Sequence, residues 1–92
     1  MKNINVLVKK WFDKINGNTY HSVTFEFKDK VYFSGFTYGY GSQYEQTFKE
    51  MFKKAYPNRN IKLYNINYNV RNNCLKRQLK EISLTDLCDL NK

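Results

Sequence analysis

The stretch KINGNTY, Lys14 to Tyr20, decides how the N-terminal half of the chain folds. Its Asn16-Gly17 pair suits a two-residue type I′ turn, because both central residues of that turn need a positive φ. The segments before and after it alternate apolar and polar residues, as strands with one buried face do. The stretch therefore predicts a β-hairpin. The cross-strand pairs expected from that turn are Val6 with Phe27, Val8 with Phe25 and Phe12 with His21.

The expected hairpin has two unlike faces. One face is entirely apolar and consists of Ile4, Val6, Val8, Val23, Phe25 and Phe27. The other mixes polar, charged and aromatic side chains: Leu7, Lys9, Trp11, Ser22, Thr24, Glu26 and Lys28. Because the alternation and the turn chemistry agree, each supports the other. We therefore expect a helix to cover the apolar face and the mixed face to meet a partner.

The segment KDKVYFSGFTYGY, Lys28 to Tyr40, predicts a third strand whose register is open. A two-residue loop before it places Tyr32, Phe36 and Tyr38 on the apolar face. A three-residue loop instead buries Val31 and Phe33, and the face that carries Trp11 and Lys9 then receives Tyr32, Phe36, Tyr38 and Tyr40. A bulge at Gly35 would switch faces within the strand. One residue of slip therefore decides whether these rings belong to the core or to a binding surface.

A helix is expected after the third strand. Ser42 and Glu45 have the spacing of a capping box, and Pro57 ends the helix at about Tyr56. Apolar residues follow at helical spacing: Tyr44, Phe48, Met51, Phe52 and Ala55. This stripe is expected to pack on the apolar face of the hairpin.

The C-terminal third predicts one more strand and a short tail. IKLYNINYNV, Ile61 to Val70, alternates apolar residues with asparagines, which predicts a fourth strand at an edge of the meander. Leu75, Leu79 and Ile82 fit a helix that starts after Asn73, although RNNC could equally turn the chain into a fifth strand. Thr85-Asp86 could cap a last helical turn.

The expected fold class is α+β, in a single domain over residues 1–92. It comprises an antiparallel β-meander of three strands, an amphipathic helix, a fourth strand and a short helical C-terminus. A homodimer through a free strand edge is compatible with this order.

The chain carries a large excess of positive charge. Sixteen Lys and Arg residues against eight Asp and Glu give the 92 residues a formal charge of +8. Such a balance favours a polyanionic or acidic partner. Solubility, together with the lysine-rich codons of an AT-rich genome, is the alternative explanation.

The cysteines and the single histidine predict no metal site. Cys74 and Cys88 lie far apart and form no Cys-x-x-Cys pair. Isolated thiols in a lysine-rich chain indicate a reducing cytoplasm, and no segment is apolar enough to be a signal peptide or a membrane span. We expect a cytoplasmic protein with no metal, no cofactor and no membrane partner.

Two features could carry chemistry, and each has a simpler interpretation. Gly39-x-Gly41 before a helix resembles a phosphate-binding loop, but it lacks the third glycine and the Lys-Ser/Thr that nucleotide loops need. A strand-to-helix hinge is the favoured interpretation. His21 has no nucleophile or carboxylate pair placed around it by the sequence. We therefore expect a protein that is not an enzyme.

Basic groups interleaved with rings predict a binding surface for single-stranded nucleic acid. Lysine and arginine follow the phosphate backbone, while rings stack bases. The competing interpretation is that the rings form the core and the lysines solvate the surface. The candidate nucleic-acid or partner-binding residues are Lys9, Lys10, Trp11, Lys28, Lys30, Tyr32, Tyr38, Tyr40, Lys53, Lys54, Arg59, Arg71, Lys76 and Arg77.

The strings VKKWFDKINGNTYHSV, Val8 to Val23, and YGYGSQYEQT, Tyr38 to Thr47, carry a resemblance. Over about residues 1–50 the chain resembles a group of small bacteriophage-encoded proteins, mostly of unassigned function. The resemblance implies a phage product in the host bacterial cytoplasm. Small phage proteins of this size commonly bind nucleic acid or block a host machine such as a CRISPR effector.

Two functions follow as hypotheses. The first is non-enzymatic binding of single-stranded nucleic acid or RNA through a cationic and aromatic sheet face. The second is a phage anti-defence inhibitor, for example an anti-CRISPR protein, that binds a host nucleic-acid-processing protein or ribonucleoprotein complex.

Overall fold

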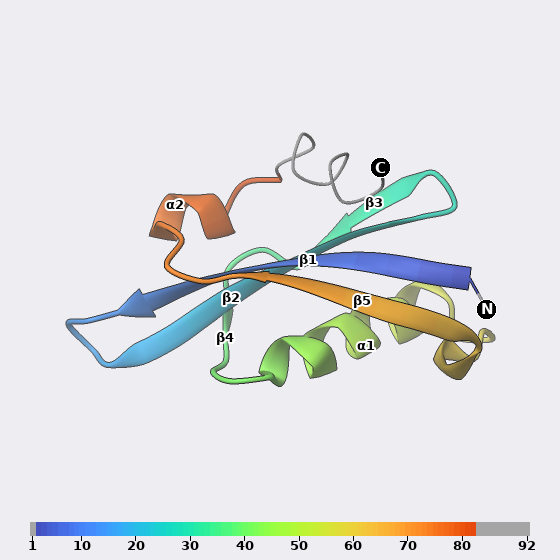
Figure 1. Cartoon of the computed structure of the whole chain (residues 1–92), viewed down its shortest axis with the longest axis horizontal. Coiled ribbons are helices and arrows are strands. Elements are labelled where there is room, and N and C mark those ends of the chain that lie inside the picture. Colours follow the sequence, from blue (N-terminus) through green and yellow to red (C-terminus); the bar gives the residue numbers. More distant parts are fainter. Residues whose placement is uncertain (1, 83–92) are drawn as a thin grey trace.

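The computed structural model describes residues 2–82. Its elements in chain order (Figure 1) are β1 Lys2–Asp13, β2 Asn18–Phe27, β3 Lys30–Phe33, β4 Thr37–Tyr38, α1 Gln43–Ala55, the 3-10 turn η1 Ile61–Leu63, β5 Tyr64–Arg71 and α2 Lys76–Leu79. The α+β class is confirmed, but the sheet has five strands instead of four. The cap predicted at Thr85-Asp86 lies outside the described residues.

The β1–β2 hairpin forms, but the predicted register is wrong by two residues. Val6 lies opposite Phe25 and Phe12 lies opposite Thr19. Because a shift of two residues preserves the alternation of side chains, each residue still points to the predicted face. The apolar face and the mixed face of the hairpin are therefore confirmed, while the individual pairs are not.

The side chain of Asp13 explains the shift. Its Oδ1 accepts hydrogen bonds from Ile15 N at 3.0 Å and Asn16 N at 3.3 Å. Pairing of the strands stops at Asp13 and Asn18, so residues 14–17 form a four-residue loop. The Asn16-Gly17 pair therefore lies within a longer loop held by Asp13, and the two-residue turn predicted there is absent.

The third strand is split by a bulge at Gly35, which has a φ of +71°. Before the bulge, Tyr32 pairs with Phe25, and after it Tyr38 pairs with Tyr20. The residue numbers of two paired partners sum to 57 before the bulge and to 58 after it. The segment from β3 to β4 therefore contains one residue more than the part of β2 that it faces, and Gly35 is that extra residue. Tyr32 therefore points to the apolar face, while Tyr38 points to the mixed face.

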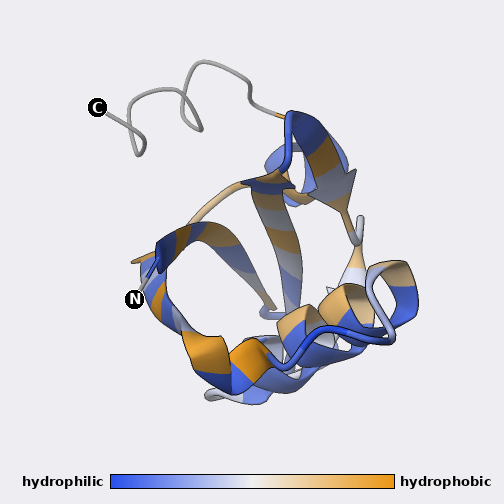
Figure 2. Cartoon of the chain, turned by 90° about the vertical axis from the view of Figure 1, so that its right-hand side faces the viewer, coloured by the Kyte–Doolittle hydropathy of each residue, from blue (hydrophilic) through white to orange (hydrophobic). Residues whose placement is uncertain are grey.

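Helix α1 covers the apolar face, as expected (Figure 1). The buried core consists of Ile4, Val6, Val8, Val23, Phe25, Phe48 and Phe52. Ser42 makes no side-chain capping bond, so the predicted capping box is not formed, and its carbonyl instead accepts from Glu45 N. Figure 2 shows the alternating bands of hydrophilic and hydrophobic residues that this arrangement produces along the strands.

Strand β5 joins the edge of the sheet beside β1 and runs parallel to it. The strand order is β3-β2-β1-β5, with β4 also paired to β2. After β5 the chain crosses to the other side of the sheet, where α2 packs on β1 and Leu79 is fully buried (Figure 1). The helical interpretation of this segment is thus confirmed over Lys76–Leu79. None of the helices within residues 2–82 combines the length and the apolarity that crossing a bilayer requires.

Candidate nucleic-acid interface

A row of aromatic side chains crosses the mixed face of the sheet near the β1–β2 loop. Trp11 of β1 stacks on Tyr20 of β2 with ring centroids 5.7 Å apart and planes 26° apart. Tyr20 also meets Tyr38 of β4 at 5.6 Å, in an edge-on arrangement. Phe36 stacks on Tyr20 at 4.4 Å. We call Trp11, Tyr20, Phe36 and Tyr38 the ring row.

Strand pairing and the bulge produce this row. Trp11 lies opposite Tyr20, and Tyr20 lies opposite Tyr38, so these three rings share one side of three adjacent strands. If this sequence continued the register of β3 without a bulge at Gly35, Phe36 and Tyr38 would point toward α1. The predicted residue set omits Tyr20 and Phe36. The alternation of β2 did contain the signal for Tyr20, since it lies two residues before Ser22.

Two lysines of the C-terminal segment lie over the ring row. Lys76 Nζ is 5.6 Å from the Trp11 ring centroid and 5.8 Å from that of Phe36. Lys80 Nζ is 5.5 Å from the Phe36 centroid. Ammonium groups over ring faces are held there weakly and remain able to meet an anion. The row therefore combines aromatic faces with the ammonium groups of two lysines above them.

A hollow of about 300 Å³ adjoins the outer end of the row. Its lining residues are Trp11, Phe12, Lys14, Asn73, Cys74 and Leu75. It forms because β5 ends at Arg71 while β1 continues, and Cys74 N then bonds to Lys10 O at 2.9 Å. One planar ring could enter this space beside Trp11, with the exposed Lys14 at its margin.

The ring row is reachable from solvent at both ends. Tyr38 is 59% exposed, and Trp11 and Phe36 are half-buried. Asp13 is the acidic residue near this end, and hydrogen bonds from Asn16 hold the pKa of its carboxyl below the ordinary value. Lys76 contributes in the same direction, which places a cation near that carboxylate. In the part of the chain that the structure describes, the interface thus joins the cations of Lys76 and Lys80 to the Asp13 carboxylate at its margin.

No protein-family model, no curated protein and no solved structure matches this chain.

Lys9 and Lys10 lie apart from the ring row. Lys9 is only 5% exposed and donates to Gln78 O at 3.4 Å beneath α2. Lys10 points to the other side of the sheet, where its Nζ donates to Gly41 O and lies 5.2 Å from the Tyr44 ring. Neither of these two candidate binding residues therefore lies over the ring row, and both make contacts within the fold.

The residues predicted from the second turn and third strand divide between several places. Lys28 and Lys30 are exposed at the end of β2 that lies away from the ring row. Tyr32 stacks on Phe25 in the core at 4.9 Å. Tyr40 is 62% exposed in the connection to α1. Of this group only Tyr38 belongs to the ring row.

The remaining predicted residues form two further groups. Lys53 and Arg59 line a separate pocket at the end of α1, and Lys54 lies on the same helix outside that pocket. Arg71 is half-buried at the end of β5, and Arg77 is exposed on α2 beside Lys76. Only Trp11, Tyr38 and Lys76 of the predicted set therefore meet at the ring row, where Lys80 joins them.

The glycine pair before α1 connects a strand to a helix and encloses His21. His21 Nδ1 lies 3.2 Å from Gly39 O, and Nε2 lies 2.7 Å from Thr47 Oγ1. Burial lowers the pKa of His21. No group of three or more His, Cys, Asp or Glu side chains able to hold a metal occurs within residues 2–82. His21 is buried in the hinge between the Gly39 carbonyl and the Thr47 hydroxyl.

Proposed function

We propose that the chain is a non-enzymatic protein that binds single-stranded nucleic acid, DNA or RNA, through the ring row. The observation that supports this is the overlap of stacked rings on three adjacent strands with Lys76 and Lys80 above them. A base extends the stack at Tyr38 or enters the hollow beside Trp11. The lysines then move from the rings to the phosphates, where they gain a full anionic partner.

The geometry favours a single strand over a duplex. Rings that stack bases need bases whose faces are unstacked and accessible, whereas the faces of duplex bases are covered by the neighbouring base pairs. The row holds a few rings and therefore engages a few nucleotides. Each stacked base is expected to contribute about 1–3 kcal/mol.

The sole tryptophan of the chain makes the proposal directly measurable. Titration with a short single-stranded oligonucleotide should quench Trp11 fluorescence, because a stacked base meets the indole. Tyr38→Ala should weaken binding about fivefold or more, with little effect on folding because this side chain is mostly exposed. The paired change Lys76→Gln with Lys80→Gln should weaken binding further.

The matched control changes the same charge elsewhere. Lys53→Gln with Lys54→Gln alters two exposed lysines on α1, on the opposite side of the sheet. It should change affinity by less than twofold. Equal losses from both lysine pairs, or binding without any change in Trp11 fluorescence, would show that the attraction is diffuse and that the ring row is not the site.

A further inference from the structure

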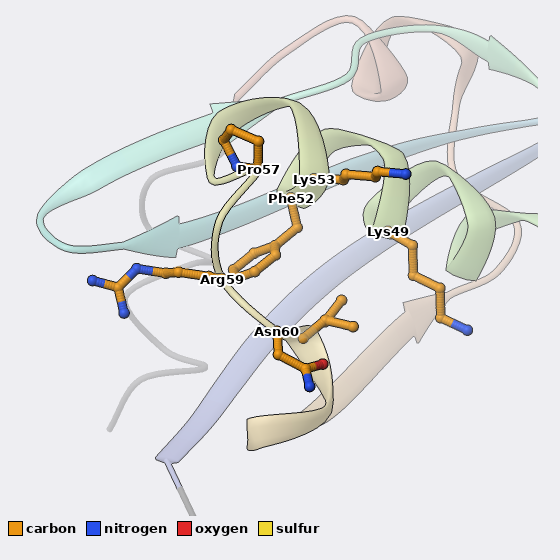
Figure 3. A pocket seen from close by; sticks show the side chains of 7 residues that line it. Lys49, Phe52, Lys53, Pro57, Arg59 and Asn60 are labelled. Atoms are coloured by element: carbon orange, nitrogen blue, oxygen red, sulfur yellow. The ribbon is translucent and has the colours of Figure 1, made fainter.

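A second hollow lies at the other end of the molecule, between the C-terminal half of α1 and η1 (Figure 3). It encloses about 250 Å³. Its lining residues are Lys49, Phe52, Lys53, Pro57, Arg59, Asn60 and Ile61. None of these belongs to the ring row, so the proposed nucleic-acid interface leaves this pocket unexplained. We call it the α1-end pocket.

The α1-end pocket joins an apolar interior to a cationic rim. Phe52, Pro57 and Ile61 supply its apolar atoms, while every charged residue that lines it is positive. Figure 3 shows Arg59 running to one side of the Phe52 ring and the two lysines running to the other. An occupant therefore places an apolar group against Pro57 and Ile61, above the buried Phe52 ring, and negative charge toward the cations on either side.

Arg59 is held in place before any ligand arrives. Its guanidinium lies 5.7 Å from the Phe27 ring centroid and 5.9 Å from that of Tyr56. Its Nη1 donates to Tyr64 Oη at 3.0 Å. A guanidinium has five N–H donors, so most remain to meet a carboxylate. Fixing this side chain in advance lowers the entropic cost of binding.

We propose that the α1-end pocket binds a short acidic segment of another protein, with one apolar side chain inserted between flanking Asp or Glu residues. The volume suits one such group, since an apolar cavity of about 150 Å³ already accommodates a benzene ring. It is smaller than the roughly 300–1,000 Å³ of pockets for whole small molecules. The three cations match the flanking carboxylates.

A nucleobase fits this pocket less well than an apolar side chain. Phe52 is only 1% exposed, so it offers little ring face for stacking. The uncharged polar side chain of the pocket is Asn60, and its Oδ1 already accepts from Lys62 N at 3.0 Å. The N–H groups of a buried base would therefore lose their hydrogen bonds to water, because the lining cations are donors and the Asn60 oxygen is already engaged, whereas an apolar side chain has none to lose.

The test uses a fluorescein-labelled peptide, Asp-Glu-Asp-Phe-Asp-Glu-Asp, and fluorescence anisotropy with the full chain. Lys49→Glu with Lys53→Glu should weaken binding at least tenfold. Lys54→Glu with Lys30→Glu is the matched control, because it makes the same charge change at exposed lysines outside the pocket. The control should weaken binding less than threefold.

The peptide itself supplies the decisive comparison, because a chain of charge +8 attracts any acidic peptide. Replacing the central Phe with Ala should lower affinity at least tenfold if that ring enters the pocket. Equal affinity for both peptides, or equal losses for both lysine pairs, would overturn the proposal. Displacement of the peptide by a short oligonucleotide, with matching losses for Lys49→Glu and Lys53→Glu in oligonucleotide binding, would assign the pocket to nucleic acid instead.

Discussion

His21 is deeply buried, and its burial lowers the pKa of its imidazole. Its ring is 1% exposed, and burial lowers its pKa below the ordinary 6.5, with Lys10 acting in the same direction and the Gly39 carbonyl opposing both. The unfolded chain therefore takes up a proton at a higher pH than the folded chain. The stabilisation that this difference represents is complete above about pH 6.5 and decreases as the pH falls toward the folded-state value.

We accordingly expect the free energy of unfolding to decrease between pH 7.5 and pH 5. His21 is the only histidine, so no other side chain with an ordinary pKa in this range complicates the result. The measurement is the urea midpoint as a function of pH. His21→Gln keeps polar contacts with its neighbours and should flatten the profile over this range. A profile unchanged by that substitution would show that His21 is not its source.

Gly39 is required by how closely His21 approaches it. A Cβ on Gly39 would lie 2.7 Å from His21 Cε1 and 2.7 Å from Gln43 Oε1. The second neighbour is the end of a flexible, exposed side chain, whereas the first is a buried ring with nowhere to move. Gly39→Ala should therefore destabilise the fold by about 1–3 kcal/mol, the usual cost of overpacking.

A double-mutant cycle separates this clash from a general effect on the hinge. In a His21→Ala background the added methyl group has space, so Gly39→Ala should cost less than half as much as in the native chain. The measurement is chemical denaturation of the four variants. Strictly additive losses of stability for the two substitutions would mean that the cost of Gly39→Ala arises in the backbone and not from a clash with the imidazole ring.

The turn between β2 and β3 places two consecutive non-glycine residues in the left-handed region of φ. Lys28 and Asp29 have φ values of +52° and +63°, and Phe27 pairs with Lys30 around them. These are the features of a type I′ turn, whose central residues are preferably Asn-Gly. A side chain in the left-handed region costs roughly 1–2 kcal/mol, and both central residues carry one.

Replacing this pair should stabilise the protein. Lys28→Asn with Asp29→Gly removes the steric conflict, and we expect the free energy of unfolding to rise by about 1 kcal/mol. Lys30→Gly is the control, because it lies in regular strand geometry where glycine is unfavourable, and it should lower stability. Thermal and urea unfolding measure both. A decrease for the Asn-Gly variant would mean that the native side chains make compensating contacts.

The elements show what the sequence could and could not predict. The faces of β1 and β2 followed from alternation alone, and they survived a register shift because that shift was even. The prediction of a type I′ turn at Asn16-Gly17 was wrong, although the residue types suit that turn. The observed type I′ turn lies at Lys28-Asp29. The hydrogen bonds that the Asp13 side chain accepts from Ile15 N and Asn16 N determine the first loop, and such local competition between hydrogen bonds is not visible in the alternation of residues.

The candidate interface was partly predictable for a related reason. Trp11 and Lys76 were identified by type and position, but their proximity depends on the chain crossing the sheet after β5. Lys9 was misplaced because burial beneath α2 depends on that same crossing. The position of Tyr38 depended on one extra residue at Gly35, for which the sequence offered a bulge as only one of three alternatives.

At the scale of the whole molecule, the charge of +8 is distributed over several surfaces. Lys76 and Lys80 lie at the ring row, while Lys49, Lys53 and Arg59 surround the α1-end pocket. Lys28 and Lys30 lie at the far end of the sheet. The net charge therefore overstates the number of cations that one bound nucleic-acid strand can reach. The salt dependence of binding measures how many phosphates those cations contact.

For single strands the slope of log affinity against log salt is about −0.7 per phosphate contacted. Three contacts, from Lys14, Lys76 and Lys80, give an expected slope near −2, whereas contacts by all the excess charge would give about −6. The measurement is oligonucleotide affinity between roughly 50 and 300 mM salt, where the slope is linear. Lys80→Gln should make the slope shallower by about 0.7, and Lys53→Gln should leave it unchanged. A slope near −6 would mean that the nucleic-acid strand wraps around the molecule. A slope that changes equally with both variants would mean that the ring row is not the binding site.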